Sequence, residues 1–497
     1  MGILMTFKYD NVGLMDFQRV DELHDIGYNR TISMMDSIKS RIHRRVNLDN
    51  IRLRRMVYRS NYPELRFKNI IIDGANTQQQ AYIKKEFHKS DNKEFSYEDL
   101  KQGYFRLLSD NMISEIIPHA IYNPEDDTYD LHLKVKLENN FAVRLGGNIS
   151  TSNSNQIYLG LSYQDLNYYA KEFVFDGQLG KVYNNAQFMA KIDFSTAIPT
   201  SYRFIASIST FDYFKKDKLF SRNDKPAFNQ KDERFLKLQV GLPFLSSKRA
   251  EFGIGIARIE DKYFQKSVID FGNDKFDKSR YDLFGGSISF NGSTLNSRQY
   301  PTRGYREALI AQIFIGRERF YPGESATGNN NKEHHSWLQL SYMKEKYHNM
   351  SEHWVLGWYL KALYASKNFS ENYTATMMQA GEFSPTQHSK LTYNEAFRAN
   401  QFVGAGIRPI YRLNQMFHLR GEFYGFMPIY PIERNSLNKA YYGKAFSKFE
   451  YLGEISVVCQ LPFGDISAYV NHYSSPKREW NVGLSIGWQL FNYRFIE

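Results

Sequence analysis

The stretch "QIYLGLSY", residues 156–163, alternates between large apolar side chains and side chains that are mostly small or polar. The odd-numbered positions, from Ile157 to Tyr163, are all large and apolar, whereas Gln156, Gly160 and Ser162 occupy even-numbered positions. Successive side chains of a β-strand point to opposite faces, so an extended strand here has one oily face and one mostly polar face. A two-residue period of this kind predicts a β-strand rather than a helix.

The same alternation recurs from Asn139 to the end of the chain, for example in "NVGLSIGWQL", residues 481–490, which predicts a last strand that continues through Leu490. About sixteen such segments can be counted, an even number that is typical of a closed bacterial outer-membrane barrel. One soluble sandwich or barrel domain rarely exceeds roughly 250 residues, so residues 139–497 are too long for such a domain. A closed membrane barrel also leaves no strand edge unpaired in lipid. We therefore predict an all-β transmembrane barrel of about 16 antiparallel strands over residues 139–497, with its apolar face toward lipid.

The composition agrees with this prediction and excludes other classes of protein. Of the 497 residues, 38 are Phe and 36 are Tyr, an excess that suits the aromatic girdles of such barrels. No run approaches the roughly 20 apolar residues of a membrane-spanning helix, which excludes a helical membrane protein. The single cysteine, Cys459, excludes an internal disulfide and a zinc cluster built from thiolates.

Positive charge is concentrated near the N-terminus. The net charge is +11, and residues 37–59, "SIKSRIHRRVNLDNIRLRRMVYR", are rich in Lys and Arg. Such a run forms either a solvated helix face or a surface for the phosphate groups of nucleic acid or lipid. We predict the solvated face and no nucleic-acid partner. Because the N-terminus lacks the apolar core of a signal peptide, we expect either a cytosolic protein or a fragment of a longer one.

Two smaller regions precede the predicted barrel. Residues 1–60 have apolar side chains at helical spacing, which predicts an amphipathic helical segment. Residues 65–138 predict the order strand, helix, helix, strand, strand in one small α+β domain. Thr77 with Gln80 is expected to cap the first helix of this domain, and Ser96 with Asp99 the second.

The tripeptide Asp73-Gly74-Ala75 has the form of the catalytic aspartate motif of patatin-type lipid hydrolases. Such a dyad needs a serine on a Gly-x-Ser-x-Gly elbow, and the chain has no such motif. The nearest imitation, "GGSISFNG" at residues 285–292, has the wrong spacing and alternates like a strand. Asp73 is therefore predicted to be a turn residue between a strand and a helix. We predict that the chain is not an enzyme and has no catalytic residues.

The small domain followed by a barrel resembles the polypeptide-transport-associated (POTRA) domain plus barrel of the BamA-type outer-membrane superfamily. The helical stretch Val12–Thr31 also resembles the end of a patatin domain, in the branch where a patatin-like phospholipase is fused to such a barrel. The resemblance implies a helical segment at 1–60, a POTRA-like domain at 65–138 and a barrel at 139–497. It also implies a bacterial outer-membrane location, with the POTRA-like domain in the periplasm.

Two motifs carry the resemblance within the barrel. "YPTRGYREALI", residues 300–310, is similar to the superfamily's Tyr/Phe-Pro-Thr-x-Gly motif, with Pro301, Thr302 and Gly304 matching. The superfamily's inward loop bears an Arg-Gly pair, for which Arg398 in "FRAN" is the candidate, although Ala399 replaces the glycine. The resemblance implies that Arg398 meets a wall carboxylate inside the lumen. Glu422 and Glu454 are the candidate partners, and Arg408 is a control expected to matter less.

The resemblance implies a barrel that anchors, assembles or translocates an attached polypeptide. Strand pairing would occur at the edge strand near residues 112–122, or at the seam between Phe141 and Trp488. Its expected partners are membrane lipids, a passenger or unfolded polypeptide and the barrel-assembly machinery, and a homodimer is one possible assembly. No cofactor is expected, and no metal, because Glu333, His334 and His335 are adjacent rather than spaced to converge.

Two alternatives stay open. The chain could be the C-terminal part of a patatin-like phospholipase whose catalytic domain lies outside it. A general pore is the third class, disfavoured because a periplasmic domain has no role in passive diffusion.

Overall fold

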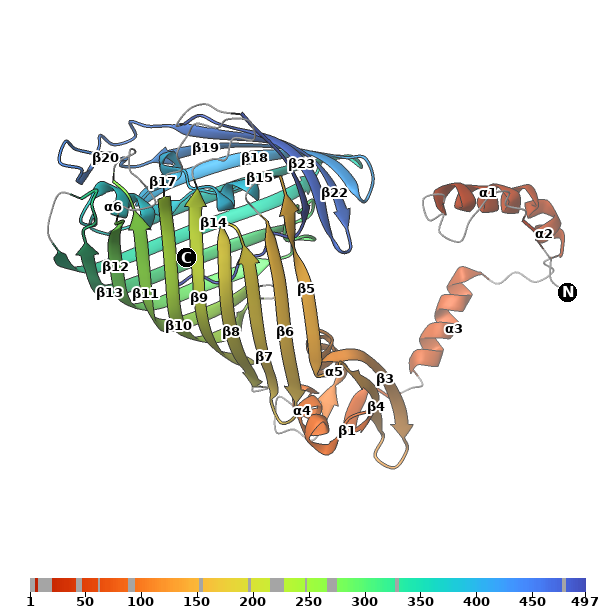
Figure 1. The fold of residues 1–497 in the computed structure, drawn as a ribbon. Helices are drawn as coiled ribbons and strands as arrows, with labels where there is room; N and C mark the ends of the chain where they lie inside the picture. The colour runs from red at the N-terminus through yellow and green to blue at the C-terminus, as the bar shows by residue number, and fades with distance from the viewer. Residues whose placement is uncertain are drawn as a thin grey trace.

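The N-terminal region is helical and lies apart from the rest of the chain (Figure 1). Three helices follow one another there, α1 (Val20–Ser33), α2 (Met35–Arg41) and α3 (Leu48–Ser60). Residues 12–19 of the stretch similar to patatin proteins lie outside the described residues. Within the described residues no helix is both long and apolar enough to cross a membrane. The computed structural model describes residues 5–7, 20–41, 47–60, 63–87, 94–151, 155–194, 198–214, 228–245, 248–265, 275–326, 330–475 and 480–497.

A small α+β unit follows, with the predicted order of elements and one additional short strand. Its sheet has the strand order β2-β1-β4-β3, in which β1 runs parallel to β4 and the other pairs are antiparallel. The strand β3 lies at one edge, where the sequence predicted an exposed edge strand. The elements are β1 (Arg66–Asp73), α4 (Thr77–Phe87), β2 (Phe95–Ser96), α5 (Tyr97–Leu108), β3 (Ile113–Asn123) and β4 (Thr128–Leu137).

The helix caps of this unit confirm one prediction and correct another. Ser96 and Asp99 form the predicted capping box of α5. The cap of α4 is Asn76, whose Oδ1 accepts from the backbone N–H groups of Gln78 and Gln79, both at 3.0 Å. The prediction of Thr77 was therefore wrong by one residue, because an Asn side chain satisfies the free amide groups at a helix start at least as well as Thr. Asp73 is exposed where β1 ends, in the turn that leads to this cap.

The unit is joined to the barrel by a shared apolar core. Ile83 of α4 and Leu107 of α5 are fully buried against Leu131 of β4. Leu166 and Ala170, which flank a barrel turn, belong to the same core and are 5% and 2% exposed. Apolar burial of this kind holds the unit against one rim of the barrel.

Sixteen antiparallel strands form a closed barrel, which confirms the predicted fold class (Figure 1). The strands are β5 (Phe141–Ser150), β6 (Gln156–Leu166), β7 (Ala170–Gly180), β8 (Tyr183–Phe194), β9 (Thr200–Phe214), β10 (Phe228–Phe244), β11 (Lys248–Tyr263), β12 (Asp277–Ser293), β13 (Gly304–Tyr321), β14 (Asn331–Asn349), β15 (Trp354–Ala365), β18 (Gln401–Arg412), β19 (Phe417–Pro428), β22 (Glu450–Leu461), β23 (Gly464–Tyr473) and β24 (Trp480–Gly487).

The two faces of the barrel wall follow the alternation in the sequence. Ile157 and Val482 point outward, with 72% and 65% of their surface exposed. Gln156 and Ser485, on the other parity, point inward and are 5% and 1% exposed. The barrel thus presents an apolar exterior and a polar interior, as the sequence predicted.

The seam of the barrel is short, and the chain leaves the wall there. Among the described residues, Ser150, Ile149 and Asn148 of β5 pair in register with Ser485, Ile486 and Gly487 of β24. The Thr151 N–H also donates to the Leu484 carbonyl oxygen, at 3.0 Å. Gly487 has φ = +111°, and a Cβ there would lie 2.2 Å from a backbone oxygen, so only glycine fits. The sequence predicted that this strand would continue to Leu490. That prediction was wrong because the turn at Gly487 directs the remaining residues into the lumen.

Candidate functional site in the barrel lumen

A long segment between β15 and β18 folds back inside the barrel. Phe383 is 2% exposed and packs against the inward rings of Phe402, Tyr424 and Phe426. We call residues 366–400 the inward segment. It contains α6 (Tyr373–Gln379), β16 (Gly381–Glu382), the 3-10 helices η2 (His388–Leu391) and η3 (Glu395–Phe397), and β17 (Arg398–Ala399). A short hairpin, β20 (Ile432–Arg434) with β21 (Ala440–Tyr442), packs beside α6.

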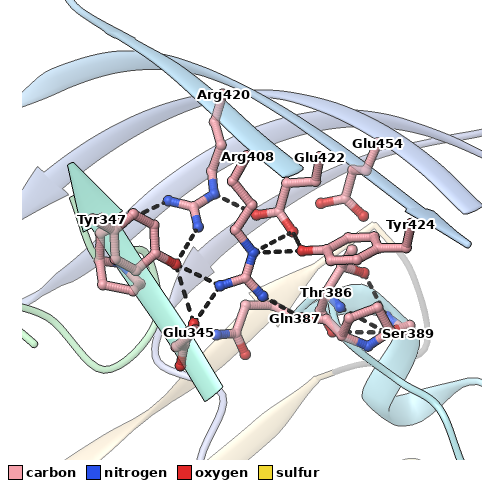
Figure 2. A network of polar contacts seen from close by, with 12 residues as sticks. Glu345, Tyr347, Thr386, Gln387, Ser389, Arg408, Arg420, Glu422, Tyr424 and Glu454 are labelled. Atoms are coloured by element: carbon pink, nitrogen blue, oxygen red, sulfur yellow. Dashed lines mark hydrogen bonds and ion pairs between the residues drawn. The ribbon is translucent and has the colours of Figure 1, made fainter. Parts of the chain in front are cut away.

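Next to this segment lies a cluster of buried charged and aromatic side chains on the inner wall (Figure 2). Glu422 accepts from Arg420 Nε and from the Tyr424 hydroxyl. Arg408 forms an ion pair with Glu345, and its Nε lies 3.7 Å from Glu422 Oε2. We call Glu345, Tyr347, Arg408, Arg420, Glu422 and Tyr424 the lumen cluster.

The lumen cluster balances its charges internally. Two guanidinium groups face two carboxylates, and the Tyr347 hydroxyl accepts from Arg408 Nη1 at 2.5 Å and from Arg420 Nη2 at 3.0 Å. Arg420 is 1% exposed and Arg408 is 4% exposed. Buried charges of this kind persist only when they are paired and hydrogen-bonded, as they are here.

The same two arginines hold both segments that the sequence singled out. Arg420 Nη1 donates to the carbonyl oxygen of Pro301 at 2.8 Å. Arg408 Nη2 donates to the carbonyl oxygen of Pro385, in the inward segment, at 3.2 Å. The lumen cluster is therefore the point at which the Tyr-Pro-Thr-x-Gly motif and the inward segment are fastened to one patch of wall.

The motif residues have structural roles at the start of β13. Pro301 is buried, and Thr302 is 6% exposed and accepts from Asn296 Nδ2 at 3.1 Å. Gly304 has φ = +92°, and a Cβ there would lie 2.1 Å from the Thr294 backbone oxygen. A left-handed residue in so tight a contact must be glycine.

Arg398 lies inside the barrel but does not meet either predicted partner. Its Nη2 is 2.8 Å from Glu382 Oε2, and its guanidinium stacks over the Tyr393 ring at 4.6 Å from the centroid. Glu382 and Arg398 are register partners in the small β16–β17 ladder. The ion pair described for Arg398 is thus with Glu382 rather than with the predicted Glu422 or Glu454, because this ladder turns Arg398 toward the opposite arm of its own segment.

His388 instead contacts the wall carboxylate. Its Nδ1 lies 2.9 Å from Glu454 Oε1, and its ring stacks on Tyr469 with 3.4 Å between centroids. Both His388 and Glu454 are buried, at 7% and 2% exposed. The sequence analysis did not single out His388.

Arg420 and Glu422 lie two apart in the sequence, which predicts an inward charge ladder on one strand face without chemistry, and Arg408 was expected only as a control. Arg420, Glu422 and Tyr424 occupy alternate positions of one strand, as do Glu345 and Tyr347 of another. Alternate positions share a face, so each strand carries a polar row on its inner face. Sequence alone could not show that the two rows meet on one patch of the inner wall.

Glu333 and His335 lie close to a third possible metal ligand, Glu318, which the spacing in the sequence did not predict. They share a face of β14, and Glu318 lies directly across from Glu333 on β13. The three ligand atoms lie within 4.8 Å of one another. His335 Nε2 is 2.9 Å from Glu318 Oε2, so one hydrogen bond accounts for the buried pair.

The structure of BamA from Haemophilus ducreyi lacking POTRA domains 1–3 matches with a TM-score of 0.57, at 12% identity, over 85% of this chain and 84% of that one. The chain shares the fold of BamA.

Two further matches are weaker. CdiB from Acinetobacter baumannii has a TM-score of 0.48 at 9% identity, covering 85% of this chain and 74% of that one. CdiB from Escherichia coli has 0.47 at 11%, covering 85% and 76%. No protein-family model matches the sequence, and no curated protein does.

Proposed function

We propose that this chain is an outer-membrane barrel of the BamA-type superfamily that assembles or translocates an attached polypeptide, with the small α+β unit in the periplasm acting as a POTRA-like domain. The fold shared with BamA supports the proposal. The apolar exterior supports a place in lipid, since lipid-facing and lumen-facing residues alternate along the strands of such barrels.

The observation that carries the proposal is the short seam. In the part of the chain that the structure describes, three register pairs join β24 to β5, with one further backbone bond at each end, whereas the neighbouring pair β23–β24 extends from Asp465↔Gly487 to His472↔Trp480. Residues 141–146 of β5 have no register partner on β24 in the described part of the chain. A strand edge with free backbone groups can accept an extended polypeptide by β-augmentation.

The edge strand β3 offers a second place for strand pairing. It lies at the outer edge of its sheet, and most of its residues are exposed. In the proposal this edge receives an extended segment before the segment reaches the seam. No catalytic step is needed, because backbone hydrogen bonds do the binding. The fused phospholipase remains a prediction, to be settled by sequence upstream of residue 1.

A disulfide across the seam tests the proposal. Ile149 and Ile486 are register partners on the outer face, so Ile149→Cys with Ile486→Cys, in a Cys459→Ser background, should form a cross-link. The matched control is Val470→Cys with Val482→Cys, which links β23 to β24 and leaves the seam free.

The readout is an epitope-tagged test domain fused ahead of residue 1, with its protease accessibility measured at the surface of a Gram-negative host. We expect oxidation of the seam pair to abolish surface exposure and reduction to restore it, while the control pair changes nothing. If the test domain is equally accessible to protease at the surface when the seam pair is oxidised and when the control pair is oxidised, transport through the seam is contradicted.

A further inference from the structure

We propose that the inner wall of the barrel carries a binding site for an extended polypeptide segment with an aromatic anchor, and that residues 489–497 of the chain itself occupy this site in the structure. This inference rests on the proposed function, because the incoming occupant would be the passenger polypeptide. It adds where inside the lumen that segment binds and which of its features are recognised.

The wall binds the main chain of the terminal residues. The Gln312 side chain donates to the Phe495 carbonyl oxygen at 3.1 Å and accepts from the Glu497 N–H at 3.0 Å. Glu233 accepts from the Phe495 N–H at 2.6 Å, and Gln339 donates to the Glu497 main-chain oxygen at 2.6 Å. Gln312 is 2% exposed and Glu233 5% exposed, so the side chains that make these contacts are themselves buried.

These contacts continue toward the seam. Gln156 accepts from the Leu490 N–H at 3.2 Å, and the Tyr183 hydroxyl accepts from the Asn492 N–H at 3.3 Å. The terminal residues therefore cross the inner face from β6 to β14. Main-chain groups are the same in every polypeptide, so a wall that binds them can accept other extended segments.

Two hydrogen-bonding groups of the wall are not satisfied by residues 489–497. Gln156 Nε2 and Gln178 Oε1 are buried and have no hydrogen-bond partner among the described residues, although the other end of each side-chain amide contacts the terminal residues. A buried amide group without a partner is costly, so a segment that satisfied these groups would compete with the chain's own.

One side chain of the segment enters a shaped apolar pocket. Phe495 is 3% exposed, with its ring centroid 5.9 Å from that of Phe235 and 5.7 Å from that of Phe314. Gly255 and Gly285 form part of the pocket, and a Cβ on either would lie about 3 Å from the Phe495 ring, at 2.9 and 3.0 Å. The missing side chains at these glycines make the room for an aromatic ring.

The wall also favours an acidic side chain two residues after the aromatic one. Lys237 Nζ lies 3.5 Å from Glu497 Oε1, and Lys237 is 4% exposed. The site therefore suits a segment with an aromatic residue followed, two positions on, by an acidic one. Arg494 Nη1 also lies 3.9 Å from Glu382, the partner of Arg398. Release of the terminal residues would therefore remove one contact of the inward segment.

The test uses the full barrel in detergent micelles and a fluorescent peptide, QLFNYRFIE, that copies residues 489–497. A variant that ends at Trp488 keeps β24 and the 2.7 Å bond from the Trp488 N–H to Gly147 while emptying the site. We expect this variant to bind the peptide at least tenfold more tightly than the full chain does. A peptide with alanine at the Phe495 position should bind at least tenfold more weakly.

Two adjacent glycines provide a matched control in the shortened variant. Gly285→Ala places a methyl group in the aromatic pocket and should weaken peptide binding, whereas Gly286→Ala, on the outer face with its nearest neighbour at 3.4 Å, should not. If the shortened variant does not fold, full-length Phe495→Ala serves instead, since it loosens the terminal residues without removing them. It should bind the peptide more tightly than the unmodified chain does.

Absence of peptide binding in both emptied variants, or equal binding of the Phe and Ala peptides, would overturn the inference. Binding in micelles requires no seam opening and no passenger transport. A failure here with a functional seam test would therefore refute only the lumen site, whereas a failed seam test with intact peptide binding would refute only the transport proposal.

Discussion

His388 Nδ1 lies 2.9 Å from Glu454 Oε1, so η2 of the inward segment is bound to the wall by a buried histidine and carboxylate pair. The imidazole is also stacked on Tyr469. Asn471 Nδ2 reaches the other oxygen of Glu454 at 3.4 Å. This contact, together with the bond from Arg408 to Pro385, sets how deeply the segment sits in the lumen.

Replacing His388 by alanine should loosen the inward segment. Of its described contacts Glu454 would keep the long one to Asn471, and a buried group that loses its partner costs about 1–3 kcal/mol. We expect faster trypsin cleavage after Lys390 and a lower unfolding midpoint in urea. His334→Ala, which changes an exposed histidine on β14, is the control and should leave both unchanged. Equal protease resistance of the two variants would show that His388 does not hold the segment.

The relative importance of Arg408 and Arg398 is the reverse of what the sequence implied. Arg408→Ala leaves Glu345 without its ion-pair partner in a buried site, and removing one member of such a pair typically costs about 3–5 kcal/mol. Arg398→Ala affects Glu382, which is 3.9 Å from Arg494 and more exposed, so its cost should be smaller. Unfolding in urea, followed by tryptophan fluorescence, should rank Arg408→Ala as the less stable variant. The opposite ranking would contradict the role given to the lumen cluster.

The orientation of the wall can be tested at two adjacent residues of β12. Ile288 points outward with 44% of its surface exposed, whereas Ser287 points inward. Ile288→Arg should lower the free energy of folding into lipid vesicles by about 2–4 kcal/mol if the residue lies near the bilayer midplane, and less toward either interface. Ser287→Arg should cost less, because its charge enters a polar lumen. Similar losses for both variants would contradict a lipid-facing exterior.

Asp110 should make the stability of the small α+β unit depend on pH. Burial raises the pKa of its carboxyl group, while bonds from the Met112 N–H and the Tyr82 hydroxyl and the nearby Lys191 oppose the rise, and Asp193 adds to it. With a raised pKa the folded state holds the proton more tightly than the unfolded state does. Stability is therefore greatest below the ordinary aspartate pKa of about 4 and falls as pH rises through the folded value.

Hydrogen exchange of α5 and β3 amides, corrected for the intrinsic effect of pH on exchange, should show this loss of protection. Asp110→Asn keeps the Oδ1 acceptor for the Met112 N–H and turns an amide N–H toward the Tyr82 hydroxyl, whose oxygen can accept it, so the variant should flatten the profile. An unchanged pH profile in Asp110→Asn would rule out this carboxyl group as the source.

The sequence by itself determined the class of fold and the two faces of the wall. The two-residue period is a local property, because the polarity of each side chain and its place in the alternation are enough to assign it to the exterior or to the lumen. Ile157 and Ser485 accordingly lie on the faces predicted for them. The cap at Ser96 and the turn after Asp73 are likewise local and were predicted correctly.

Only the tertiary structure decided which side chains meet inside the barrel. Glu345, Arg408 and Arg420 are far apart in the sequence, and they converge because the closed sheet curves their strands around one lumen. The β16–β17 ladder turned Arg398 away from Glu422, and the turn at Gly487 directed Phe495 into a pocket on the far wall. Contacts across a lumen depend on closure and on the path of long connections, and neither leaves a periodic signal in the sequence.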